Sequence, residues 1–147
     1  MTTQNQQSKS YALALKMLMR REHSQLELSK KLQLKGFNDI DIKHSIDLLI
    51  EQKYQSDERF SEAFIIMRYN QGKGPVIISS ELKKRGIESF DISIIDWFEL
   101  AKEVRKKKFG QNFPLDFKTQ AKQKRFLNSR GFNFDEIHKA FPRLFLE

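Results

Sequence analysis

The sequence predicts an all-α fold made of three tandem three-helix modules that form an elongated, curved helical-repeat array. The first observation behind this prediction is a short pattern that occurs three times, around Gly36, Gly86 and Gly131. These glycines are 50 and 45 residues apart, a period typical of proteins built from stacked helical modules. The second observation is that only three prolines and six glycines interrupt 147 residues, of which 39% are hydrophobic. This composition suits helices that each bury one face.

Each copy of the pattern carries the signals for a helix end, a turn and the start of another helix. A leucine stands four residues before the glycine, a cation directly before it and an apolar residue directly after it. A glycine just past a helix adopts the left-handed conformation without a Cβ penalty, and the cation favours the negative helix C-terminus. A polar residue suited to cap a helix comes two residues after the glycine, and an acid suited to the first helical turn comes five after it. From leucine to acid, the copies are residues 32–41, 82–91 and 127–136.

The first module is predicted to cover residues 10–54. The preceding residues, 1–9, are polar and are expected to form a disordered tail. Ser24 and Glu27 have the spacing of a capping box, which predicts that a helix begins there. The three helices of the module are expected at Ser10–Arg21, from Ser24 to Gly36, and from Asp39 to Gln52.

The second module is predicted to cover residues 55–96. Asp57 is expected to cap its first helix, which runs out at Gln71–Gly74. Pro75 is expected to begin the second helix, because proline is tolerated at a first helical position. A short third helix is predicted at Ser89–Ile95.

The third module is predicted to cover residues 97–147. Asp96 and Glu99 offer a capping pair, so its first helix is expected to begin at the first residue of the module. Phe113-Pro114 is predicted to open the second helix and Asn133 the last. Three apolar residues at the end of the chain are expected to pack back onto this module: Leu144, Phe145 and Leu146.

The charge is concentrated at one end of the chain. The sequence contains 27 Lys and Arg against 19 Asp and Glu, which gives a formal net charge of +8. Residues 99–147 hold twelve of these cations and six of the acids, a net charge of +6. A basic balance of this size favours a polyanionic partner, of which nucleic acid is the commonest. An ordinary solvated surface is the alternative interpretation.

No motif predicts an enzyme, a cofactor or a metal site. The absence of cysteine excludes thiol catalysis, disulfides and cysteine-ligated metal. His23 and His44 fall in the first predicted module and His138 in the third, and the three form no metal-ligand pattern. The Gln71–Pro75 stretch lacks the Gly-Lys-Ser/Thr ending of a phosphate-binding loop. No apolar run reaches the roughly 20 residues of a membrane span and the polar start is unlike a signal peptide, so a soluble, cytoplasmic protein is expected.

The turn pattern also resembles a helix-turn-helix, whose second helix would enter the DNA major groove. The charges argue against this interpretation, because residues 39–52 carry four acids and one lysine, and phosphates would repel them. Lys118, Lys122 and Arg125 instead form one stripe at helical spacing, which suits a phosphate backbone or an acidic protein surface. Tyr69 lies off the apolar stripe of its helix and is a candidate for stacking on a base.

Several stretches, in this order and at this spacing, resemble the family of the bacterial regulatory protein RecX. The first is Ala12-x-x-Leu15-x-x-Leu18-x-x-Arg21-x-His23-Ser24-x-x-Glu27-Leu28-x-x-Lys31-Leu32. The next are Tyr54-x-x-Asp57-x-x-Phe60, Arg68-x-x-x-Gly72-x-Gly74-Pro75-x-x-Ile78 and Glu81-Leu82-x-x-Arg85-Gly86-Ile87. The last runs from Trp97 through Lys108-Phe109-Gly110 to Arg125-Phe126-Leu127-x-x-Arg130-Gly131-Phe132. The resemblance covers about residues 10 to 141.

The resemblance implies a modulator of the RecA recombinase. Members of the family bind along the groove of the RecA filament on single-stranded DNA, and they limit its growth, ATP hydrolysis, strand exchange and LexA co-protease activity. The expected partners are therefore RecA and single-stranded DNA, with double-stranded DNA as a further candidate, and the chain is expected to be a monomer. The alternative function is a sequence-independent basic helical DNA-binding protein, whose salt-sensitive affinity comes from the third module.

Nine cations in turns and on helix faces are hypothesised to lie toward the filament groove and to block addition of RecA monomers. For each of them, the alternative is a solvated cation at a helix C-terminus. The run Arg105–Lys108 covers nearly the full circumference of its helix, so it cannot form a single binding face. The nine hypothesised site residues are Arg20, Arg21, Lys73, Lys83, Lys84, Arg85, Lys122, Arg125 and Arg130.

Overall fold

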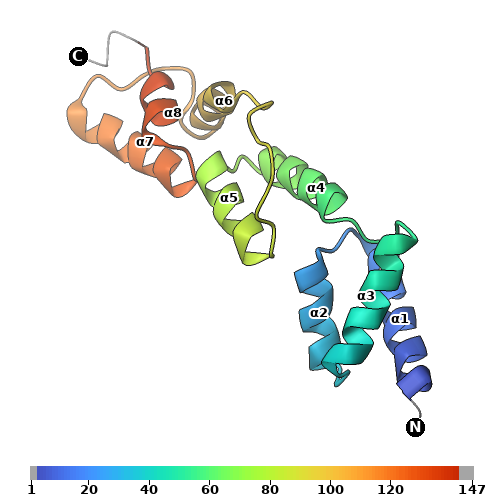
Figure 1. The fold of residues 1–147 in the computed structure, drawn as a ribbon. Coiled ribbons are helices and arrows are strands. Elements are labelled where there is room, and N and C mark those ends of the chain that lie inside the picture. Colours follow the sequence, from blue (N-terminus) through green and yellow to red (C-terminus); the bar gives the residue numbers. More distant parts are fainter. Residues whose placement is uncertain (1–2, 143–147) are drawn as a thin grey trace. The chain divides into compact units, whose positions relative to one another are not determined.

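A computed structural model describes residues 3–142 of the chain, and over this range the protein is all-α, as predicted (Figure 1). The chain folds into two compact units. Unit 1 comprises the chain up to Phe64 together with Leu82–Phe90, and unit 2 comprises Ile65–Glu81 together with the chain from Asp91 onward. The helices of the described residues are α1 (Thr3–Arg20), α2 (Gln25–Leu34), α3 (Asp39–Glu51), α4 (Asp57–Asn70), α5 (Pro75–Lys84), α6 (Trp97–Phe109), α7 (Phe117–Ser129) and α8 (Phe134–Lys139).

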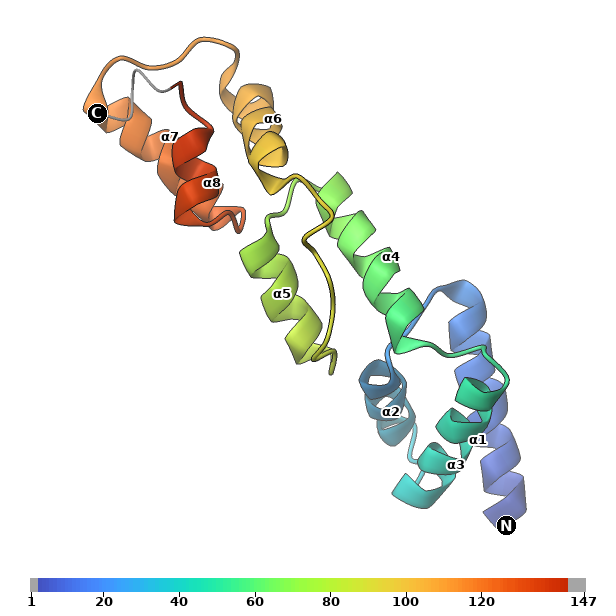
Figure 2. The ribbon, with the colours of Figure 1, turned by 45° about the horizontal axis from the view of Figure 1, so that its top comes forward.

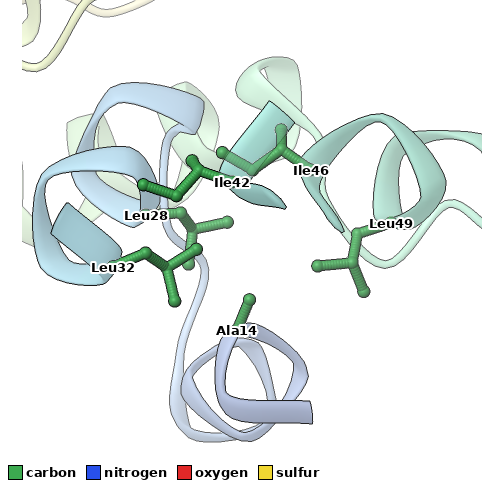
Figure 3. Packing of buried hydrophobic residues seen from close by; sticks show 6 residues of the cluster. All are labelled: Ala14, Leu28, Leu32, Ile42, Ile46 and Leu49. Atoms are coloured by element: carbon green, nitrogen blue, oxygen red, sulfur yellow. The ribbon is translucent and has the colours of Figure 1, made fainter. Parts of the chain in front are cut away.

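The core of unit 1 lies between α1, α2 and α3. Apolar residues three or four positions apart fall on one helix face, and in this unit those faces converge. Figure 3 shows side chains from all three helices meeting at the centre of this core. The six residues drawn there, all buried, are Ala14, Leu28, Leu32, Ile42, Ile46 and Leu49.

The start of α1 corrects the prediction of a disordered tail over residues 1–9. The helix already begins at Thr3, and only the first two residues lie outside the described range. Ser10 is fully buried, and the Ser45 hydroxyl on α3 donates to its hydroxyl oxygen at 2.9 Å. The same Ser45 hydroxyl lies 3.4 Å from the Gln7 carbonyl oxygen. Packing on α3 therefore holds a polar stretch in a helix that sequence composition alone did not predict.

Each of the three repeated glycines ends a helix, as predicted. The N–H of the residue after the glycine donates to the leucine carbonyl, at 3.2 Å for Phe37, 3.0 Å for Ile87 and 3.3 Å for Phe132. The glycine N–H donates to the carbonyl three residues earlier, which completes the Schellman motif in all three copies. The φ angles of the three glycines, between 83° and 97°, lie in the left-handed region that favours glycine.

The helix predicted at Ser89–Ile95 is absent, and residues 85–96 contain no helix. The Asp91 carboxylate instead accepts hydrogen bonds from the backbone N–H and the hydroxyl of Ser93. Such local side-chain bonds compete with the helix, and the β-branched isoleucines of this stretch favour it weakly. At the two ends of the stretch Ile87 is buried, while the Trp97 indole donates to the Ile92 carbonyl at 2.8 Å. The second copy of the repeat therefore ends one helix without beginning another.

Most helix starts follow the predicted caps. Ser24 caps α2 and Asn133 caps α8, both with complete capping boxes, and Asp96 caps α6. Two starts differ from the predictions. Ser56, rather than Asp57, accepts the Arg59 N–H at the start of α4, because the Asp57 carboxylate accepts from the Gln25 N–H and the Gln55 amide instead. The second helix of the third module begins at Phe117 behind the cap Asp116, and not at Phe113-Pro114.

Helices α6, α7 and α8 pack against one another in unit 2, and α7 and α8 lie side by side in both ribbon views (Figure 1, Figure 2). Leu100 and Ala101 of α6 are buried, and so are Leu127 of α7 and Phe132 just after it. The expected packing of Leu144, Phe145 and Leu146 lies outside the described residues.

Candidate nucleic-acid interface

Five of the nine hypothesised site residues belong to unit 1: Arg20, Arg21, Lys83, Lys84 and Arg85. Arg20 is the last residue of α1, and Lys83 and Lys84 form the last turn of α5. All three side chains are exposed. All three stand at helix C-termini, where the helix dipole is negative, a position that also fits the alternative of a solvated cation.

Glu27 brings Arg21 and Arg85 together. The Arg21 guanidinium donates to both Glu27 carboxylate oxygens, at 3.2 and 3.3 Å, and Arg85 Nε lies 3.7 Å from Glu27 Oε2. The Arg85 guanidinium also lies 4.7 Å from the centre of the Phe64 ring. Burial alone would raise the pKa of Glu27, but hydrogen bonds from Arg21 and Ser24 hold this pKa below its usual value. These two arginines therefore have partners inside the molecule that an external anion would have to compete with.

The other four hypothesised residues, Lys73, Lys122, Arg125 and Arg130, belong to unit 2. Lys73 is half-buried in the turn after α4, and its backbone N–H donates to the Arg68 carbonyl oxygen at 3.0 Å. Lys122 and Arg125 are exposed on α7. Arg125 lines a hollow of about 310 Å³, where the Phe134 ring stacks on His138 at 5.3 Å.

Arg130 lines a larger hollow of unit 2, which we call the α4–α6–α7 hollow. Its volume is about 480 Å³, and it lies between the end of α4, one face of α6 and the C-terminal part of α7. Three cations and one acid line it: Lys107, Lys108, Arg130 and Glu103. Its other walls are Tyr69, Asn70, Gln71, Gly72, Leu100, Val104 and Phe126.

The three cations of this hollow make no ion pair with any acid among residues 3–142. Lys108 Nζ lies 5.5 Å and the Arg130 guanidinium 5.1 Å from the centre of the Phe126 ring. The ring is held from the other helix by an edge contact with Phe109 at 5.3 Å. The hollow therefore combines positive charge with aromatic surface, the two features that single-stranded nucleic acid needs.

Sequence reasoning missed Lys107 and Lys108 because the run Arg105–Lys108 had no unique face. The structure divides the run between two sites. Lys107 and Lys108 line the α4–α6–α7 hollow, while Arg105 and Lys106 line a separate hollow of about 540 Å³ beside Lys139 and Phe141. The sequence could not predict this division, because it depends on which helices pack around α6.

Arg105 is a buried structural residue and not a solvated cation. Its side chain is 2% exposed. Nη1 donates to the Gln123 amide oxygen at 3.0 Å and Nη2 to the Gly110 carbonyl at 2.8 Å. The guanidinium stacks 4.1 Å from the centre of the Phe113 ring. Burial lowers the pKa of Arg105, yet an arginine stays charged at neutral pH.

His23 is also structural. Its Nε2 lies 2.9 Å from the Lys31 ammonium, and its Nδ1 lies 3.0 Å from the Arg21 carbonyl. Because an ammonium only donates, Nε2 accepts, and Nδ1 carries the proton that it donates to Arg21. Burial lowers the pKa of His23, and the charges of Arg21 and Lys31 act in the same direction.

Residues 3–142 form neither a metal-binding cluster nor a membrane-spanning helix. No group of three or more His, Cys, Asp or Glu in this range is placed to hold a metal ion. None of the helices in the same range combines the length and the apolar character needed to cross a bilayer.

Comparison with known proteins shows the family to which the chain belongs. Three sequence models match it in consecutive stretches: the first three-helix domain of RecX at residues 11–49, the second at 56–94 and the third at 95–141. The chain belongs to the RecX family. The tandem three-helix organisation predicted from the glycine repeat is thus the domain organisation of RecX.

Curated RecX proteins are similar over most of their length. The regulatory protein RecX of Acinetobacter baylyi is 38% identical over 141 residues, which cover 93% of this chain and 89% of the relative. That of Legionella pneumophila is 38% identical over 143 residues, covering 93% and 95%. The crystal structure of RecX from Lactobacillus salivarius has the same fold, with a TM-score of 0.78 at 22% identity, over 92% of this chain and 94% of that one.

Proposed function

We propose that this RecX-family chain is a negative regulator of the RecA recombinase in the cytoplasm. It binds the filament of RecA on single-stranded DNA and limits filament extension, ATP hydrolysis, strand exchange and LexA co-protease activity. It thereby acts in recombination, DNA repair and the SOS response. The observation that carries this proposal is the match of three RecX domains, in order, along the chain.

The distribution of charge supports binding to a nucleoprotein surface. Exposed cations occur at helix ends of unit 1 and along α7 of unit 2. The starts of α3 and α8, the helices that follow a repeat glycine, carry acids instead. Of these acids, Asp41 and Glu136 are buried, so they serve the fold and are not available to read bases. Electrostatic contact with phosphates positions a protein without specifying sequence, as a filament regulator requires.

A second candidate function is sequence-independent binding to bare DNA. The net charge of +6 over residues 99–147 and the cation-lined hollow of unit 2 favour it. The two functions differ in what RecA adds. A filament regulator binds RecA-coated single strands more tightly than bare ones and acts well below stoichiometric coverage.

The test is the ATPase rate of the cognate RecA on single-stranded DNA, titrated with this protein. We expect inhibition at a protein concentration well below that of RecA. The double variant Lys122→Ala/Arg125→Ala removes two exposed cations of α7 and is expected to inhibit less. Lys16→Ala/Lys30→Ala removes the same charge from exposed positions of unit 1 and serves as the matched control.

Two results would contradict the regulator proposal. One is the absence of inhibition at any ratio of this protein to RecA. The other is inhibition only at concentrations at which the protein alone saturates the DNA and displaces RecA by competition. The second result would favour the other candidate function, sequence-independent binding to bare DNA.

A further inference from the structure

We infer that the α4–α6–α7 hollow binds one unpaired nucleotide of a single strand, with its base against Tyr69 and its phosphate between Lys107, Lys108 and Arg130. The inference rests on the proposed function, because it names the part of the filament that unit 2 would touch. It adds a specific site, a ligand class and two residues, Lys107 and Lys108, that the family resemblance did not assign.

The charges of the hollow select an anion. Three cations line it against one carboxylate, that of Glu103. No acid among residues 3–142 pairs with any of the three cations, so an anion in the hollow would not have to displace a carboxylate. A phosphodiester bound there would replace water around them and release counterions from the strand.

The walls of the hollow suit a base. Tyr69 contacts the Trp97 ring edge-on, with 6.2 Å between ring centres, which fixes the position of the phenol. Within residues 3–142 the Tyr69 hydroxyl has no hydrogen-bond partner, so it is free to meet a ligand. The exposed Asn70 amide lies beside it and carries both a donor and an acceptor. Aromatic rings and amides at unpaired bases are the usual means of binding single strands.

The size of the hollow favours a single strand over a duplex. A volume of about 480 Å³ is that of a small-molecule site. A base held in a duplex is stacked and paired, and it would have to be extruded before it entered such a hollow, which costs unstacking energy. An unpaired base enters without that cost.

The first arm of the test removes the cations. Binding of a fluorescent oligo-dT strand is measured for Lys107→Gln/Lys108→Gln and for Lys102→Gln/Lys106→Gln, which lowers the charge of the same helix equally but outside the hollow. We expect the first pair to weaken binding about tenfold and to reduce the slope of log affinity against log salt by about 0.7 to 1.4. The control pair is expected to change both quantities much less.

The second arm examines the base. The same strand is compared with an abasic strand that keeps the phosphates and sugars. Wild type is expected to prefer the intact strand about tenfold, Tyr69→Phe to keep that preference, and Tyr69→Ala to lose it. Glu103→Gln is expected to tighten binding of both strands, because it removes the one negative charge of the hollow. Helical circular dichroism and Trp97 emission check that each variant is folded.

Equal effects of the two lysine pairs would overturn the inference, and so would a Tyr69→Ala variant that still prefers the intact strand. The RecA ATPase titration is run on the same variants. If wild type fails to inhibit RecA while the lysine and Tyr69 effects appear, the proposed function fails and the nucleotide site stands. If wild type inhibits RecA but the effects are absent, the function stands and the site is wrong.

Discussion

The backbone N–H of Gly74 donates to the carbonyl oxygen of Arg130 at 2.7 Å, which joins the turn after α4 to the turn after α7. The Val76 N–H adds a second bond to the Gly131 carbonyl at 2.9 Å. Two turns far apart in the sequence thus meet backbone to backbone in unit 2. Arg130, a wall of the α4–α6–α7 hollow, is fixed at this junction.

Gly74→Ala is expected to destabilise unit 2 by about 3 kcal/mol or more. A Cβ at this position would lie 2.5 Å from the carbonyl carbon and oxygen of Gly131, and backbone cannot move aside as a side chain does. Urea unfolding followed by emission of Trp97, the one tryptophan, reports on this unit. Gly110→Ala is the control, because a Cβ there meets nothing and the φ of 88° alone should cost about 1 to 2 kcal/mol. Equal losses in the two variants would contradict the close approach.

Gly86→Ala is expected to cost more than Gly36→Ala, although both glycines lie in unit 1 and follow a helix with φ near 90°. The left-handed conformation alone costs about 1 to 2 kcal/mol for a residue with a Cβ. At Gly86 that Cβ would also lie 2.9 Å from Leu26 Cβ, whereas at Gly36 it meets nothing within 4 Å. Overpacking should therefore add about 1 to 3 kcal/mol at Gly86. Thermal unfolding by circular dichroism gives the comparison, and Gly86→Val should lose still more.

Arg105→Lys is expected to destabilise unit 2 by about 2 kcal/mol, since a lysine cannot reproduce two divergent hydrogen bonds and the stacking on Phe113. The neighbouring Lys106→Gln changes an exposed residue and should stay within about 0.5 kcal/mol of wild type. Urea unfolding monitored at Trp97 measures both. If Arg105→Lys were as stable as Lys106→Gln, the buried guanidinium would have no structural role.

Unit 1 is expected to lose stability as the pH falls from about 7.5 to 5.5. The pKa of His23 is lowered in the folded state from the ordinary 6.5, so the unfolded chain binds the proton more readily. The stability contributed by neutral His23 is therefore complete above the ordinary pKa and declines as the pH falls through it toward the folded pKa. Thermal unfolding of wild type and His23→Gln across this range isolates the effect from His44 and His138. A parallel pH dependence in the two proteins would rule out the titration of His23 as its cause.

The parts of the fold that the sequence predicted well are those set by neighbouring residues. A glycine after a cation ends a helix through bonds to its own last turn, and Ser24 or Asn133 caps a helix through a residue three positions on. Such signals need no knowledge of the rest of the molecule. The all-α class and the repeat of three helical modules followed from them.

The errors arose where contacts between segments, or competing local bonds, decide the outcome. The polar residues before Ser10 are helical because they pack on α3. Asp57 does not cap α4, because its carboxylate accepts hydrogen bonds from Gln25 and Gln55 instead. At Ser89–Ile95 the repeat pattern favoured a helix. The helix does not form, because the Asp91–Ser93 hydrogen bonds compete with it and the β-branched isoleucines favour it weakly. The missed wall of the candidate site, Lys107 and Lys108, depends on packing around α6. The nine hypothesised site residues stay predictions until variants are measured.

The compact units do not follow the order of the chain, since unit 2 combines Ile65–Glu81 with the chain from Asp91 onward. A fragment that begins at Trp97 would contain α6, α7 and α8 but neither Tyr69 nor Gly74. It would expose the backbone of the Arg130–Gly131 turn and lose one wall of the nucleotide site. Cutting the protein at its sequence repeats therefore separates residues that fold as one body, and a fragment intended to retain this site must begin no later than Ile65.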